Sequence, residues 1–162
     1  MNRHVTKRDG ATASRVAGCV ARGIVTIGGT PRFAATLSRS VDVGAAVSAV
    51  WSMIGPFCAI KDWLPPVGTC TESAASPPER TLVTKDGKAT FVETQTARSD
   101  AGHSYSYVFK SSPLPVTDYA STIKVVSKAA GVSTVTWSST YVPDTGKEEA
   151  ASEALSGIYE GG

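Results

Sequence analysis

The sequence has 162 residues, of which 41% are hydrophobic and 19% are charged, and its formal net charge at pH 7 is +2. This composition is typical of one soluble globular domain that is large enough to bury a core. The small net charge argues against nucleic-acid binding, and no apolar run reaches the ~20 residues of a membrane span.

The N-terminal segment differs in character from the rest of the chain. Residues 1–33 contain a single acidic residue, Asp9, against six basic ones: Arg3, Lys7, Arg8, Arg15, Arg22 and Arg32. We interpret residues 1–33 as a basic leader or a disordered tail, and residues 34–162 as the ligand-binding domain. A tail would fit a cytoplasmic protein, whereas a leader would fit organelle targeting or export.

A strand and two short helices open the domain. Phe33–Val43 alternates apolar and polar side chains, which predicts a strand. A helix that ends at Gly55 follows, because four residues form an apolar stripe with helical spacing: Val47, Val50, Trp51 and Ile54. Phe57–Leu64 predicts a second short helix, which is closed by two prolines.

Six further strands and a final helix follow, separated by turns rich in glycine, proline and aspartate. The strands are predicted at Val67–Glu72, Arg80–Lys85, Lys88–Glu93, His103–Lys110, Asp118–Val126 and Ser133–Tyr141, and the helix at Lys147–Glu160. In the fifth of the domain's seven strands, Tyr105, Tyr107 and Phe109 share one face, while Lys110 marks the other face as the outer one. Three aromatic rings are therefore expected to point inward.

The hairpin from Arg80 to Glu93 is the most informative stretch. Asp86-Gly87 between two strands predicts a two-residue type I′ turn. Arg80 then stands opposite Glu93 and Leu82 opposite Phe91, on the inner face. The charged pair is either a rim salt bridge that fixes the register, contributing about 0.2–1 kcal/mol, or a polar spot inside a ligand cavity.

The order of elements, β-α-α-β6-α, predicts an α+β fold. A curved seven-stranded antiparallel sheet needs a cover, and the C-terminal helix is the natural one. Side chains cannot fill all the space between a strongly curved sheet and one helix. We therefore expect an internal cavity, lined by the inward-facing tyrosines.

Cysteines and histidines give no indication of a metal site. Cys19, Cys58 and Cys70 lack the spacing of metal ligands, and His4 and His103 are the only histidines. Cys58 and Cys70 are interpreted as small core residues, and the odd number of cysteines favours a reducing compartment. Because the sequence carries no nucleotide-binding motif, we expect no cofactor.

An ordered set of motifs resembles the START-like (SRPBCC) superfamily, in its polyketide cyclase/dehydrase-like branch. The set begins with Trp51–Phe57 and Lys61–Pro65, and continues through Glu79–Leu82, Asp86-Gly87, Val92-Glu93, Ser104–Tyr107, Pro113–Pro115, Asp118-Tyr119 and Val135–Ser138. The resemblance implies a helix-grip fold that encloses a pocket for a hydrophobic small molecule.

One branch of this superfamily, similar to plant lachrymatory-factor synthase, uses an arginine, a glutamate and tyrosines in its pocket. By motif, these residues fall on Arg80, Glu93, Tyr107 and Tyr119. Arg80 and Glu93 are thus the candidate catalytic residues. The predicted ligand-binding residues are Leu82, Phe91, Tyr105, Tyr107, Phe109, Tyr119 and Trp137.

The sequence departs from the superfamily pattern in two places. Leu64 occupies a position where a histidine is common. At ~1.5 Å per residue, the final helix spans only about 20 Å, whereas the superfamily's helix runs several turns further. Either the cavity is incompletely roofed, or the chain is shortened relative to the functional protein.

Two functional hypotheses remain open on the sequence alone. The first is a protein that binds or carries a hydrophobic small molecule, as a polyketide cyclase/dehydrase or lipid-transport-like protein does. The second is a cofactor-free lyase, cyclase or isomerase in which Glu93 transfers a proton and Arg80, with Tyr107 or Tyr119, stabilises an oxyanion. A partner-binding accessory protein is a third possibility, suggested by the basic N-terminal segment.

Overall fold

The computed structural model describes residues 33–162. The predicted leader or tail, residues 1–33, lies outside these residues apart from Phe33. The described chain contains seven strands and three α-helices, with one 3-10 helix between α1 and α2. The strands are β1 (Ala35–Val43), β2 (Val67–Ser73), β3 (Glu79–Thr84), β4 (Thr90–Ser99), β5 (Ser104–Ser111), β6 (Val116–Ala129) and β7 (Val132–Pro143). The helices are α1 (Val47–Ile54), η1 (Phe57–Ala59), α2 (Ile60–Trp63) and α3 (Glu148–Gly161).

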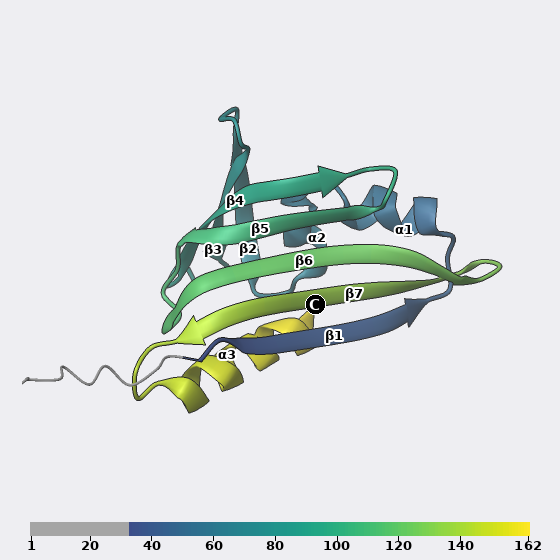
Figure 1. The fold of residues 1–162 in the computed structure, drawn as a ribbon. Helices are drawn as coiled ribbons and strands as arrows, with labels where there is room; N and C mark the ends of the chain where they lie inside the picture. Colours follow the sequence, from purple (N-terminus) through teal and green to yellow (C-terminus); the bar gives the residue numbers. More distant parts are fainter. Residues whose placement is uncertain (1–32) are drawn as a thin grey trace, which may run out of the picture. The chain divides into compact units, whose positions relative to one another are not determined.

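All seven strands form one antiparallel sheet in the order β1-β7-β6-β5-β4-β3-β2. The sheet curves strongly, and the helices lie behind it in the view of Figure 1. α1 contacts β6 and β7, α2 contacts β2, and α3 contacts β1 and β7. This arrangement confirms the predicted helix-grip architecture.

The helices pack onto the sheet through the apolar stripes that the sequence predicts. α1 buries Val50 and Trp51, and α3 buries Ala151, Leu155 and Tyr159. None of the helices within residues 33–162 is long and apolar enough to cross a membrane.

The hairpin between β3 and β4 has the predicted register but not the predicted turn. Arg80 pairs with Glu93 and Leu82 with Phe91, as expected. Gly87 has a positive φ of 70°, but Asp86 does not, so the turn is not type I′. The Asp86 carboxylate accepts hydrogen bonds from the Lys88 backbone N–H (3.0 Å) and the Thr84 hydroxyl (2.6 Å). These bonds stabilise a different turn, in which only the glycine needs the left-handed region.

A bulge near the start of β6 turns Tyr119 inward. The pairing of β6 with β7 shifts between Thr117 and Ala120, and Asp118 has a φ of 50°. An aspartate tolerates this conformation better than most non-glycine residues. Tyr119 is consequently buried, at 4% exposure, while Asp118 is exposed.

Candidate functional site

Arg80 and Glu93 form an ion pair inside the protein. Their side chains meet across β3 and β4, with exposures of 0% and 5%. Arg80 Nε donates a hydrogen bond of 2.6 Å to Glu93 Oε2. Since exposed partners would be needed for a rim salt bridge, the structure rules out that alternative for this pair.

The rest of the Arg80 guanidinium contacts aromatic rings and one backbone carbonyl. Its Cζ atom lies 4.1 Å from the centre of the Phe57 ring and 4.9 Å from that of Tyr107. Nη1 donates to the Phe57 carbonyl oxygen, whereas Nη2 has no hydrogen-bond partner within residues 33–162. The aromatic faces and the carbonyl stabilise a positive charge that water does not reach.

A small apolar cavity of about 120 Å³ adjoins Glu93. Strands β3 to β7 supply one side of it, and Ile60, Leu64, Leu155 and Ile158 of the α2 and α3 regions supply another. Glu93 Oε1 accepts no hydrogen bond from the described part of the chain. Burial raises the pKa of Glu93, and the opposing effect of the Arg80 charge does not cancel this rise. Glu93 thus offers the cavity an acceptor that binds a proton more readily than an ordinary glutamate.

A directional chain of hydroxyl groups connects α3 to the sheet. Ser121 Oγ donates to the Ser138 carbonyl, at 3.0 Å, and so must accept from Trp137 Nε1 (2.9 Å) and from the Tyr159 hydroxyl (2.9 Å). Tyr159 has then used its proton, so the Tyr119 hydroxyl donates to Tyr159 across 2.8 Å. The hydroxyl protons of Tyr119 and Tyr159 are therefore committed to internal bonds.

Tyr107 differs from Tyr119 because its hydroxyl proton remains available. Trp137 Nε1 also donates to the Tyr107 oxygen, at 3.1 Å, and no acceptor within residues 33–162 takes the Tyr107 proton. Burial and the nearby Glu93 raise the pKa of Tyr107 well above its ordinary value, so the hydroxyl stays protonated. Tyr107 and Glu93 both line the cavity. Tyr107 contributes a hydrogen-bond donor to this lining, and Glu93 contributes an acceptor.

Most of the residues predicted from the sequence gather at this cavity. Its lining includes Glu93 and six of the predicted ligand-binding residues: Leu82, Phe91, Tyr107, Phe109, Tyr119 and Trp137. Tyr105 and Arg80 are not part of the lining. Tyr105 lies outside the lining because its ring packs against Phe57 of η1 and Trp51 of α1. Its role in ligand binding stays a prediction.

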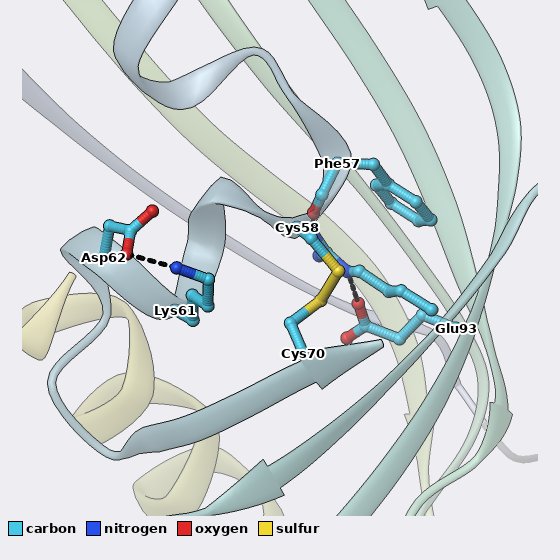
Figure 2. The surroundings of a disulfide bond; sticks show 7 residues. Phe57, Cys58, Lys61, Asp62, Cys70 and Glu93 are labelled. Carbon is cyan, nitrogen blue, oxygen red and sulfur yellow. Dashed lines mark hydrogen bonds and ion pairs between the residues drawn. A yellow bond between two sulfur atoms is a disulfide. The ribbon is translucent and has the colours of Figure 1, made fainter. Parts of the chain in front are cut away.

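The prediction that Cys58 and Cys70 are separate core thiols is wrong. The two residues form a disulfide that joins η1 to β2 (Figure 2). Both cysteines are only partly buried. Because two of the three cysteines are paired with each other, the odd number of cysteines no longer supports a reducing compartment.

An open apolar groove of about 430 Å³ lies beside the C-terminal end of α3. Val41 of β1, Met53 of α1 and Trp63 of α2 contribute to its lining, and Trp137 borders both this groove and the inner cavity. Within residues 33–162, no three histidine, cysteine or acidic side chains are grouped to hold a metal ion.

Comparison with known proteins places this chain in a family. The sequence model described as polyketide cyclase/dehydrase and lipid transport matches residues 34–162. The chain belongs to this polyketide cyclase/dehydrase and lipid transport family. The resemblance seen in the sequence motifs is thereby confirmed, and no curated protein matches the sequence.

Solved structures of similar proteins share the fold of this family member. The protein XoxI from Bacillus cereus is 32% identical, covers 79% of this chain and 89% of its own, and gives a TM-score of 0.73. An uncharacterised Bacillus thuringiensis protein is 31% identical, with coverages of 78% and 91% and a TM-score of 0.72. The ZhuI aromatase/cyclase from Streptomyces sp. R1128, at 14% identity, shares the fold with a TM-score of 0.64 over 79% of this chain and 86% of its own.

The direction of the hydroxyl chain predicts unequal costs for two tyrosine-to-phenylalanine changes in this family member. Tyr159→Phe removes the acceptor of Tyr119 and a donor to Ser121, so we expect the free energy of unfolding to fall by about 1–3 kcal/mol. Tyr107→Phe leaves the Trp137–Ser121 bond intact and is expected to cost less than about 1 kcal/mol. Urea unfolding of both variants measures the two losses of unfolding free energy. Equal losses would contradict the assigned direction of the hydrogen bonds from Tyr119 to Tyr159 and from Tyr159 to Ser121.

The raised pKa of Glu93 predicts a pH dependence of stability. The folded protein holds the Glu93 proton more tightly than the unfolded chain, whose ordinary glutamate pKa is 4.5. This contribution to stability is fully present below pH 4.5 and is lost as pH rises through the folded pKa. Urea unfolding of the wild-type protein and of Glu93→Gln across pH 4–8 should show this decline in the wild type alone. Parallel curves for the two proteins would exclude it.

Proposed function

We propose that this protein binds a small hydrophobic molecule bearing a carbonyl group in the Glu93 cavity, and that Glu93 removes a proton next to that carbonyl. The proposal is carried by the Glu93 carboxylate in the lining of a largely apolar cavity, since its Oε1 accepts no hydrogen bond from the described residues. Tyr107, whose hydroxyl proton is not taken by the described residues, belongs to the same lining. The description of the family, polyketide cyclase/dehydrase and lipid transport, supports cyclisation or dehydration as the class of reaction.

The proposed chemistry uses only side chains of the chain itself. Glu93 Oε1 takes the proton from the carbon beside the carbonyl. The electron pair of that C–H bond forms a carbon–carbon double bond, and the π pair of the carbonyl group moves onto its oxygen. Tyr107 donates its free hydroxyl proton as a hydrogen bond to the resulting enolate. Arg80 stays behind Glu93 and, by its charge, limits how far burial raises the pKa of the carboxyl.

A second candidate function is carriage of the same class of molecule without chemistry. The nearly complete apolar lining of the cavity supports it, because such a surface retains a hydrophobic guest without any proton transfer.

The two candidates are separated by Glu93→Gln, which keeps the shape of the side chain and removes its basicity. If Glu93 is a general base, turnover of β-keto substrates should fall by about 10²–10⁴-fold while ligand affinity stays within a few-fold. Glu72→Gln is the matched control, since it makes the same change on an exposed carboxylate that does not line the cavity, and it should retain turnover.

If the wild-type protein turns over no member of a panel of β-keto and sulfenic substrates, while it and Glu93→Gln bind aromatic or fatty ligands equally well, then the protein is a carrier.

A further inference from the structure

The segment that carries the disulfide also holds the buried ion pair. Cys58 follows Phe57, whose carbonyl accepts a hydrogen bond from Arg80 Nη1 and whose ring lies against the guanidinium. Cys70, the other end of the disulfide, stands opposite Leu82 in the register of β2 with β3, two residues along from Arg80. Figure 2 shows the bond with Phe57, Cys58, Cys70 and Glu93 in one view.

We propose that the Cys58–Cys70 disulfide is a positioning element for Glu93: by fixing the Phe57 carbonyl on Arg80, it prevents the arginine from pairing with both oxygens of the carboxylate. Glu93 Oε1 then stays free toward the cavity. The inference concerns regulation of the site proposed above and rests on that site's function for its biological meaning.

The hydrogen bonds around Arg80 support this role. Arginine prefers to bind a carboxylate through two parallel N–H groups, and Nε with Nη2 forms one such fork. Here only Nε bonds to Glu93, while Nη2 is buried without a partner in the described chain and Oε1 accepts nothing. An unpartnered buried N–H is costly, so the guanidinium should turn toward Oε1 unless something restrains it. The Phe57 carbonyl on Nη1 is that restraint.

Release of the restraint has a consequence for Glu93. A second N–H bond would occupy Oε1 and stabilise the charged carboxylate, which lowers the pKa of Glu93. The other polar groups near Glu93 are Tyr105 and Tyr107 of β5 and Tyr159 of α3, all neutral as phenols. Glu72 of β2 stands opposite Arg80, but its side chain is exposed. Arg80 is therefore the charged group through which the carboxyl would respond.

A dithiol such as dithiothreitol can reach the bond, because both cysteines are partly exposed. The dithiol supplies two electrons and two protons: the sulfur–sulfur bond breaks, Cys58 and Cys70 each gain an S–H, and the reductant closes into a cyclic disulfide.

The experiment measures the pKa of Glu93 by NMR titration of protein labelled with ¹³C at the glutamate carboxyl, with Glu93→Gln to assign the signal. The samples are the oxidised protein, the dithiothreitol-reduced protein and C58A/C70A. We expect the pKa of Glu93 to fall by about one unit in both samples that lack the disulfide, a tenfold loss of proton affinity. Dithiothreitol should have no effect on C58A/C70A.

Val125→Ala is the control for general loosening, since Val125 is a buried core residue that lines neither the cavity nor the groove. It should lower stability and leave the pKa of Glu93 unchanged. An equal pKa in all three samples would overturn the proposal, as would unfolding of both disulfide-free samples, which would make the bond purely structural. The titration needs no ligand, so a pKa shift without turnover would retain the positioning role and reject the catalytic one.

Discussion

Replacing Arg80 by methionine is expected to lower the free energy of unfolding at pH 7 by about 3–5 kcal/mol, because it leaves the buried Glu93 carboxylate without its partner. The loss includes the hydrogen bond to Nε and the contact of the guanidinium with the Phe57 ring. Urea unfolding at pH 7 measures it.

Two comparisons distinguish this cause from a simple packing defect. Removing both charges, in R80M/E93M, should recover most of the stability, because a well-packed apolar pair needs no compensation. The penalty of R80M should also be smaller at pH 5 than at pH 7, because burial raises the pKa of Glu93 and a protonated carboxyl carries no charge for Arg80 to compensate. The contrary result is a double variant R80M/E93M that is as unstable as R80M, with R80M losing the same free energy of unfolding at pH 5 and at pH 7. That result would show that the lost side-chain volume, and not the unpaired charge, causes the instability.

Loss of the disulfide is the second large effect. The cysteines are separated by 12 residues, and closing a loop of this size stabilises a folded protein by about 3 kcal/mol in the chain-entropy description. For a domain of this length, C58A/C70A should therefore melt roughly 10 °C below the oxidised protein.

Calorimetry with and without dithiothreitol tests this expectation. The reductant should lower the melting temperature of the wild-type protein to that of C58A/C70A and should leave the variant unchanged. A melting temperature that is insensitive to both treatments would mean that the folded contacts of η1 with β2 hold the loop closed without the bond.

The register of the β3–β4 hairpin was predictable because two signals agree. Alternation along each strand assigns Leu82 and Phe91 to one face, and the lysines mark the other, so only one pairing satisfies both strands. The inward position of Tyr107 follows from the same reasoning on β5. The buried ion pair follows in turn, since Arg80 and Glu93 share the face of Leu82 and Phe91.

Other features depend on contacts that the sequence does not display. The turn at Asp86 is decided by its carboxylate, which bonds to the Lys88 N–H and so competes with the type I′ conformation. Tyr105 points inward as predicted, but η1 covers it and separates it from the cavity. The disulfide requires η1 to lie against the edge strand β2, an approach that no local pattern encodes. The sequence pattern also does not show that the Tyr119 hydroxyl donates to Tyr159, whereas the Tyr107 hydroxyl proton has no acceptor within residues 33–162.

The volume of the inner cavity has a consequence for the rate at which a ligand can enter. A space of about 120 Å³ is smaller than the cavity of about 150 Å³ that admits a benzene molecule in another protein. Any guest larger than one ring must therefore displace some of the side chains that line the space, such as those of α2 or α3. Association should then be limited by the frequency of this opening rather than by diffusion, and tightly bound guests should leave slowly, with a steep temperature dependence of the dissociation rate.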